Sequence, residues 1–182
     1  MNNNNNNIKQ GVTYGIIGGL IFLAISFGPW ALGSVGDFVK VTTITNFIPF
    51  HFIILLVIGF KLRKDNGGLY SFKEALQFTF VAYVIYALIE AVGTYVLYVL
   101  LDPALTAKVL DISIANATQW FEKLGMPEEE IEKTIKKMQA EPKNTTFKQV
   151  FLGLGLSIGF NFLKALILSV IIKKNEELPD QI

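Results

Sequence analysis

The chain has 182 residues, of which 52% are hydrophobic and 17% charged, with a net charge of +1. Its charges gather in short segments between long apolar ones, which favours a membrane protein and excludes a nucleic-acid-binding one, because no basic patch stands out above its acidic neighbours. The lack of cysteine excludes disulfides and thiolate metal sites, and a single histidine, His51, excludes a multi-histidine centre. The sequence predicts no cofactor.

The chain opens with an asparagine run, residues 2–7, before the first apolar residue. A homopolymer of this kind has no side chains with which to build a core. We therefore expect a disordered Asn-rich tail over residues 1–10. Residues 175–182 are expected to form a C-terminal tail.

Four apolar segments lie between the tails, and each approaches the roughly 20 residues that a helix needs to cross a bilayer. They cover residues 11–32, 46–62, 75–101 and 150–172. The sequence therefore predicts an all-α polytopic membrane protein with four transmembrane helices, in a membrane domain over residues 11–174. The first segment could instead be a signal peptide, since Ala31-Leu32-Gly33 is a small-x-small triplet, although its apolar stretch is longer than usual. Cleavage there would leave three spans.

Local signals mark the boundaries of these segments. Asn66-Gly67-Gly68 tolerates positive φ, so the chain can reverse between the second and third spans. Ser71 and Glu74 fit a capping box at the start of the third span. Asp102-Pro103 is expected to end it, because proline cannot donate to the helix behind it.

Residues 104–141 change to an amphipathic pattern. Apolar residues recur at helical spacing on one face, at Leu105, Val109, Ile112, Trp120 and Leu124. Gly125 suits a helix stop and Pro127 the first turn of the next helix. That next helix begins with three glutamates and continues with lysines, so it is too charged to cross a membrane. The pattern predicts an extramembrane helical hairpin between spans three and four.

Basic residues in the short loops indicate the orientation of the spans. They are Lys61, Arg63, Lys64 and Lys73 between spans two and three, and Lys173 and Lys174 after span four. Four spans would put all of them on one side of the membrane, together with the N-terminus. The positive-inside rule then predicts that both termini are cytoplasmic.

Small residues repeat along two spans. Gly11, Gly15 and Gly19 recur every four residues in the first span, and Gly155 and Gly159 repeat the spacing in the fourth. Such stripes let helices approach closely. We expect packing within the chain rather than between copies.

The fourth span also matches the G-x-S-x-G expression of serine hydrolases, with Ser157 at its centre. In those enzymes the serine sits on a strained strand-to-helix turn, which a transmembrane helix cannot supply. A dyad of Ser157 with His51 would lack a third group and an oxyanion donor. The packing interpretation is therefore favoured over a catalytic one.

Glu90 and Lys164 each lie within an otherwise apolar span, with Asn161 one turn before the lysine. Ionisable groups inside a membrane are costly and by default suggest a function. Because helical side chains lean toward their own N-terminus, we expect Glu90 and Lys164 to face each other in the bundle. A structural ion pair, a lysine reaching for the interface, and a role in ion or proton movement all remain open. His51 is interpreted as an interfacial polar residue.

The layout of the whole sequence resembles a bacterial family catalogued as domain of unknown function 4199. The resemblance covers residues 8–174. It rests on the glycine-rich first span, Lys61-x-Arg63, Gly67-Gly68-x-x-Ser71-Phe72, Asp102-Pro103, the charged hairpin and Lys173-Lys174. It implies a four-span protein of the bacterial inner membrane with no assigned activity, and an association with neighbouring glycosyltransferases that these residues neither support nor oppose.

The sequence shows no credible catalytic constellation, so we expect a non-enzymatic membrane protein that acts by binding a partner or lipid. The hairpin over residues 105–139 is the expected docking surface. The alternative is a small transporter or channel component that uses Glu90 and Lys164. The sequence does not specify the oligomeric state.

Overall fold

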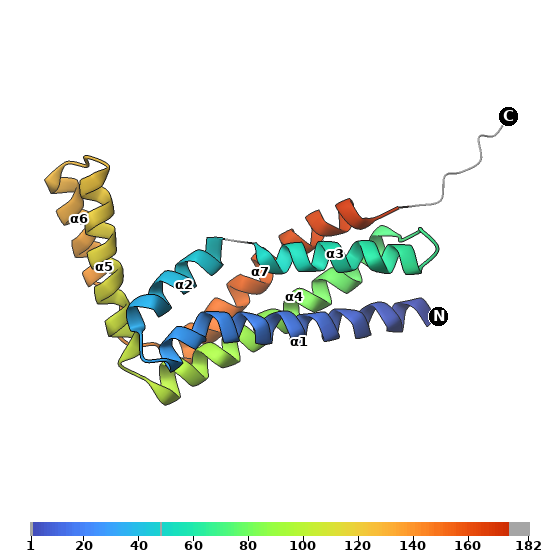
Figure 1. Ribbon diagram of the computed structural model, residues 1–182, viewed down its shortest axis with the longest axis horizontal. Coiled ribbons are helices and arrows are strands. Elements are labelled where there is room, and N and C mark those ends of the chain that lie inside the picture. The colour runs from blue at the N-terminus through green and yellow to red at the C-terminus, as the bar shows by residue number, and fades with distance from the viewer. Residues whose placement is uncertain (1, 48, 175–182) are drawn as a thin grey trace. The chain divides into compact units, whose positions relative to one another are not determined.

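The computed structural model describes residues 2–47 and 49–174, and every regular element in that part of the chain is helical (Figure 1). The elements are α1 (Asn2–Ala31), α2 (Val35–Phe47), α3 (Phe50–Asp65), α4 (Phe72–Tyr95), the π-helical segment η1 (Val96–Leu101), α5 (Leu105–Lys123), α6 (Glu128–Gln139) and α7 (Phe147–Ile172). The predicted all-α class is confirmed.

Three of these helical stretches are long and apolar enough to cross a membrane. They are Asn5–Ala31, Phe72–Leu101 and Phe147–Ile172. The pair Val35–Thr45 and Phe50–Asp65 passes the same test as one bent span, which gives three or four crossings. The second span therefore differs from the predicted continuous helix over residues 46–62, because Pro49 cannot donate within a helix and α3 begins only after it.

The predicted boundary signals are present. Gly67 and Gly68 have φ of +71° and +87°, which reverses the chain after α3. The Ser71 amide donates to the Glu74 carboxylate at 2.8 Å, and the Glu74 amide donates to Ser71 Oγ at 3.3 Å, forming the expected capping box of α4. The stretch α4–η1 ends at Leu101, directly before Asp102.

The prediction of a disordered tail over residues 1–10 is wrong, because α1 begins at Asn2. Asn7 is buried, and its Oδ1 accepts a hydrogen bond from the Tyr70 hydroxyl at 2.9 Å. Burial raises the pKa of Tyr70, so the phenol stays protonated and remains the donor. Composition alone could not predict this tertiary contact. The predicted C-terminal tail, residues 175–182, lies outside the described residues.

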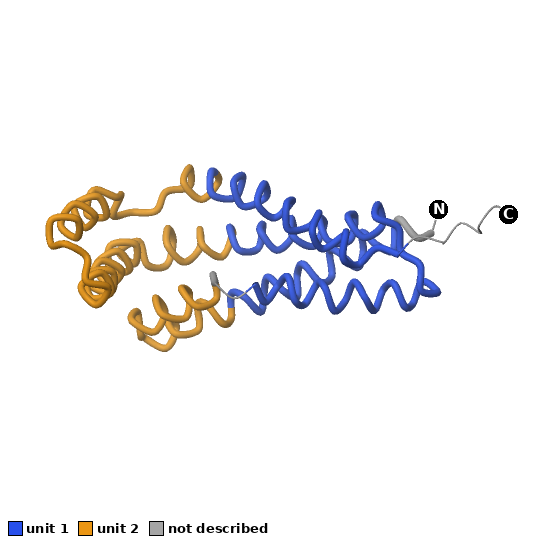
Figure 2. Tube along the Cα trace, turned by 90° about the horizontal axis from the view of Figure 1, so that it is seen from above, with its two compact units in different colours: residues 1–23, 48–91, 152–182 blue, residues 24–47, 92–151 orange. Residues whose placement is uncertain are grey.

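The helices form two compact units (Figure 2). Unit 1 comprises residues 1–23, 48–91 and 152–182. Its core is a cluster of buried apolar side chains from α3, α4, α7 and the α3–α4 loop, among them Leu55, Tyr70, Phe78, Ala82, Leu168 and Ile172. One end of the unit is tied by an antiparallel bridge between Tyr70 and Lys174 and by a hydrogen bond from Arg63 to the Ile172 carbonyl at 3.2 Å.

Unit 2 comprises residues 24–47 and 92–151, and it contains α2, α5 and α6. Its core is Phe38, Val39, Leu97 and Leu105, all buried. Asp102, the residue that follows η1, accepts hydrogen bonds from Trp30 Nε1 at 3.2 Å and from Lys108 Nζ at 3.0 Å. These bonds lower the pKa of Asp102, that from Lys108 most strongly. The carboxylate therefore fixes the chain where the π-helical segment turns into α5.

Candidate functional site

The predicted polar residues of unit 1 lie on α4 and α7 but do not form a direct ion pair. Lys164 Nζ donates to Asn161 Oδ1 at 3.3 Å, and Asn161 Nδ2 donates in turn to Ser157 Oγ at 3.3 Å. Within residues 2–47 and 49–174, none of the ion pairs joins Glu90 to Lys164. The expected contact is therefore absent, since the lysine leans toward its own N-terminus and bonds the amide one turn back.

His51 was interpreted from the sequence as an interfacial polar residue. In the structure it is buried, with only 5% of its surface exposed. Its ring stacks on Tyr86 with centroids 4.2 Å apart and meets Tyr83 edge-on at 5.2 Å. Across from these rings it touches Gly18 of α1, where an added Cβ would overlap the imidazole.

The neighbours of His51 place it deep in the candidate spans. Gly18 is the central residue of the stretch Asn5–Ala31, and Tyr86 is one of the two central residues of Phe72–Leu101. The imidazole therefore lies at the depth where both helices would cross the middle of a bilayer. The one signal in the sequence was Pro49, which starts a new helix just before the histidine.

Three buried polar atoms in this region have no hydrogen-bond partner among the described residues. They are Nδ1 and Nε2 of His51 and the hydroxyl oxygen of Tyr83, a side chain with 2% exposure. Buried polar groups in proteins are nearly always paired, so unpaired ones require an explanation.

The glycine stripe of α1 lies against α4. A Cβ at Gly11 would come within 2.8 Å of the Phe78 carbonyl oxygen, and one at Gly15 within 2.6 Å of that of Ala82. One at Gly19 would come within 2.9 Å of Ile89. These glycines therefore lie directly against α4.

The other stripe has no such neighbour. A Cβ at Gly155 or Gly159 would meet nothing within 4 Å among the described atoms, so the expectation of packing within the chain is not met there. Ser157, between them, lies inside α7 and accepts the bond from Asn161. In the described part of the chain, no group of three or more His, Asp and Glu side chains could hold a metal ion.

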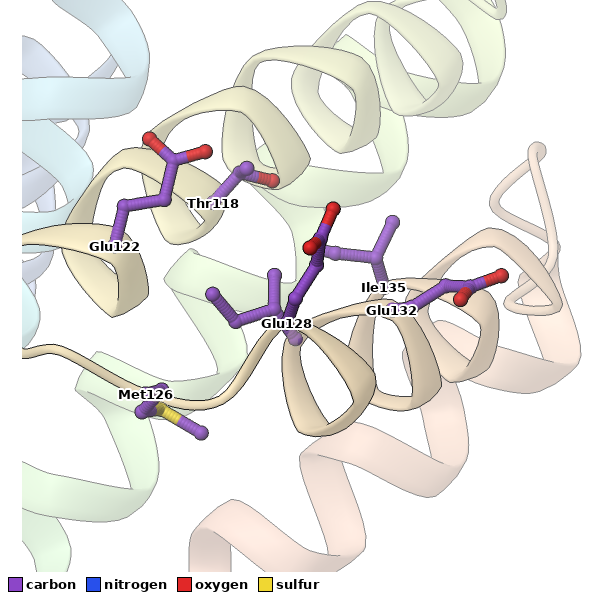
Figure 3. A pocket seen from close by; sticks show the side chains of 7 residues that line it. Thr118, Glu122, Met126, Glu128, Glu132 and Ile135 are labelled. Carbon is purple, nitrogen blue, oxygen red and sulfur yellow. The ribbon is translucent and has the colours of Figure 1, made fainter.

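A second candidate site lies in unit 2, between α5 and α6. It is a pocket of about 560 Å³, lined by Thr118, Glu122, Met126, Glu128, Ile131, Glu132 and Ile135. Figure 3 shows the Thr118 and Glu122 side chains on α5 and those of Glu128, Glu132 and Ile135 on α6. The two helices join at Gly125, whose φ of +69° turns the chain.

The pocket combines an apolar floor with an acidic rim. Its apolar side chains are Met126, Ile131 and Ile135, and its three acids are Glu122, Glu128 and Glu132. Glu132 pairs with Lys136 at 2.6 Å, and this bond lowers its pKa. Glu122 and Glu128 form no ion pair within the described residues. The lysines of α6, Lys133, Lys136 and Lys137, line a neighbouring hollow together with Glu129 and Glu132.

A family model described as "Protein of unknown function (DUF4199)" matches residues 13–174. No curated protein and no solved structure matches the chain.

Proposed function

The chain belongs to the family described as Protein of unknown function (DUF4199), whose description assigns no activity. From the geometry we propose that it is a multi-pass membrane protein that binds a partner protein through the pocket between α5 and α6. The observation that carries this proposal is the acidic, apolar-floored pocket on two helices that are not among the candidate spans.

The proposed topology has four spans, with the bent pair counted as one. It is supported by contacts within unit 1, where the start of α1, the α3–α4 loop and the end of α7 meet through Asn7, Tyr70 and Lys174. Three segments can meet in this way if an even number of crossings separates them. By the positive-inside rule, this end of unit 1 would lie in the cytoplasm, because it carries the basic residues of the short loops. They are Lys61, Arg63, Lys64, Lys73, Lys173 and Lys174. The α5–α6 pocket would then lie on the opposite side.

The topology is testable by single-cysteine labelling, since the chain has no native cysteine. We expect a cysteine at Asn66 to label from the cytoplasmic side and one at Glu129 from the other side. Labelling of both positions from one face would eliminate the four-span arrangement.

The partner that this pocket fits is a segment with apolar side chains flanked by lysine or arginine. An amphipathic helix lays its apolar face into a groove, here the one formed by Met126, Ile131 and Ile135. Glu122 and Glu128, which form no ion pair in the described part of the chain, would pair with the flanking cations. An anionic lipid surface would be repelled by the same carboxylates, so a basic protein segment is favoured over lipid.

The test is photo-crosslinking in native membranes with a benzophenone side chain at Thr118. Gln119 is the matched control, because it is exposed on the same helix but does not line the pocket. We expect Thr118 to crosslink to a segment that mass spectrometry identifies as basic and apolar, and Gln119 not to. The charge reversals Glu122→Lys and Glu128→Lys should abolish that crosslink. Equal crosslinking from both positions, or no effect of charge reversal, would refute the proposal.

A further inference from the structure

His51 and Tyr83 present polar atoms that the protein itself does not pair. In either neutral tautomer, one imidazole nitrogen is a donor and the other an acceptor, and a phenol can do both. None of these atoms finds a partner in the described ranges, and both side chains are more than nine-tenths buried. In the hydrocarbon region no bulk solvent is at hand to replace the missing bonds.

The packing around the imidazole prevents it from turning toward another protein group. Tyr86 covers one face of the ring, and Tyr83 meets it at an interplanar angle of 72°. On the side of α1 the ring lies against Gly18, so closely that a Cβ there would overlap it. Because Nδ1 is the ring nitrogen that lies against Gly18, Nε2 is the imidazole nitrogen left for a small molecule to bind.

We propose that His51 and Tyr83 form an intramembrane binding site for water. Water is the smallest ligand that can donate to one nitrogen and accept from the other group, and the two rings, with centroids 5.2 Å apart, are close enough to share it. Bound water of this kind typically bonds otherwise unsatisfied buried polar groups.

The single histidine makes this proposal directly measurable. The protein is labelled with ¹⁵N-histidine and reconstituted in phosphatidylcholine nanodiscs, so that every imidazole ¹⁵N signal comes from His51. We expect the unprotonated nitrogen to resonate upfield, as a hydrogen-bonded acceptor does, and the imidazole N–H to exchange with D₂O. An acceptor signal typical of a free nitrogen, together with an N–H protected from D₂O, would overturn the proposal.

A pair of variants separates a hydrated site from a dry one. Tyr83→Phe removes the unpaired hydroxyl, and Tyr86→Phe is the matched control, since its ring touches the same imidazole but its hydroxyl is not among the unpaired atoms. We expect Tyr83→Phe to shift the His51 nitrogen signals and slow their exchange, and Tyr86→Phe to leave both unchanged. In a dry site Tyr83→Phe would leave these signals in place and raise the unfolding midpoint, because an unsatisfied group would have been removed. If a variant does not fold, the ¹⁵N-histidine spectrum of the wild-type protein alone tests whether His51 binds water.

Discussion

Replacing Gly15 by alanine tests how unit 1 is held together. The added Cβ would lie 2.6 Å from the Ala82 carbonyl oxygen and 2.8 Å from Ile85 Cβ. Real Cβ atoms essentially never approach a neighbour within 3.0 Å. The first of these obstacles is backbone, so rotation of a side chain cannot relieve it. The two helices must move apart.

The expected cost follows from two opposing terms. Overpacking a well-packed contact costs about 1–3 kcal/mol, while alanine is about 1 kcal/mol more favourable than glycine within a helix. At a glycine with open space around it, replacement by alanine causes no overpacking, so the change in stability reports only the greater helix propensity of alanine. Gly159 of α7 is such a position, since a Cβ there meets nothing within 4 Å. The difference between the two variants should therefore equal the overpacking term, about 1–3 kcal/mol.

The assay is reversible unfolding in mixed micelles, followed by far-ultraviolet circular dichroism. We expect Gly15→Ala to lower the free energy of unfolding relative to Gly159→Ala by that amount. Gly159→Ala itself should be neutral or slightly stabilising. If Gly15→Ala is as stable as Gly159→Ala, the inference that α1 packs against α4 through its glycines is refuted.

Three further predictions concern the polar groups described above. Glu90→Gln and Lys164→Met should show a coupling above about 0.5 kcal/mol in a double-mutant unfolding cycle; strict additivity would mean that the two charges do not interact. Asp102, whose folded pKa is lowered by Lys108, should contribute stability that is present above pH ~4 and lost as pH falls further, so the stability difference between wild type and Asp102→Asn should shrink on acidification. Ser157→Ala should leave cellular phenotype intact, and labelling of Ser157 by a fluorophosphonate probe would contradict this.

The parts of the fold that could be predicted are those that local chemistry determines. Apolar length predicted the candidate spans, and the capping box at Ser71 and Glu74 predicted the start of α4. The same motif occurs at Ser34 and Asp37, where the Asp37 amide donates to Ser34 Oγ at 3.2 Å in the first turn of α2. Apolar length did not predict α2, although this local signal marks its start.

The parts that could not be predicted depend on contacts between distant segments. The asparagine run gives no hint that Asn7 pairs with Tyr70, a residue 63 positions away. The burial of His51 likewise depends on Gly18 and Tyr86, which come from other helices. The lean of helical side chains predicted that Glu90 and Lys164 would face each other but did not predict the competing bond from Lys164 to Asn161.

The tie between Asn7, Tyr70 and Lys174 has a consequence for biogenesis. The ribosome delivers α1 to the membrane first, yet this tie can close only after α7 has been synthesised and inserted. Until then the buried partners of Leu168 and Ile172 on α3 and α4 stay uncovered. A chain that stops before residue 147 would therefore leave these apolar side chains of α3 and α4 uncovered.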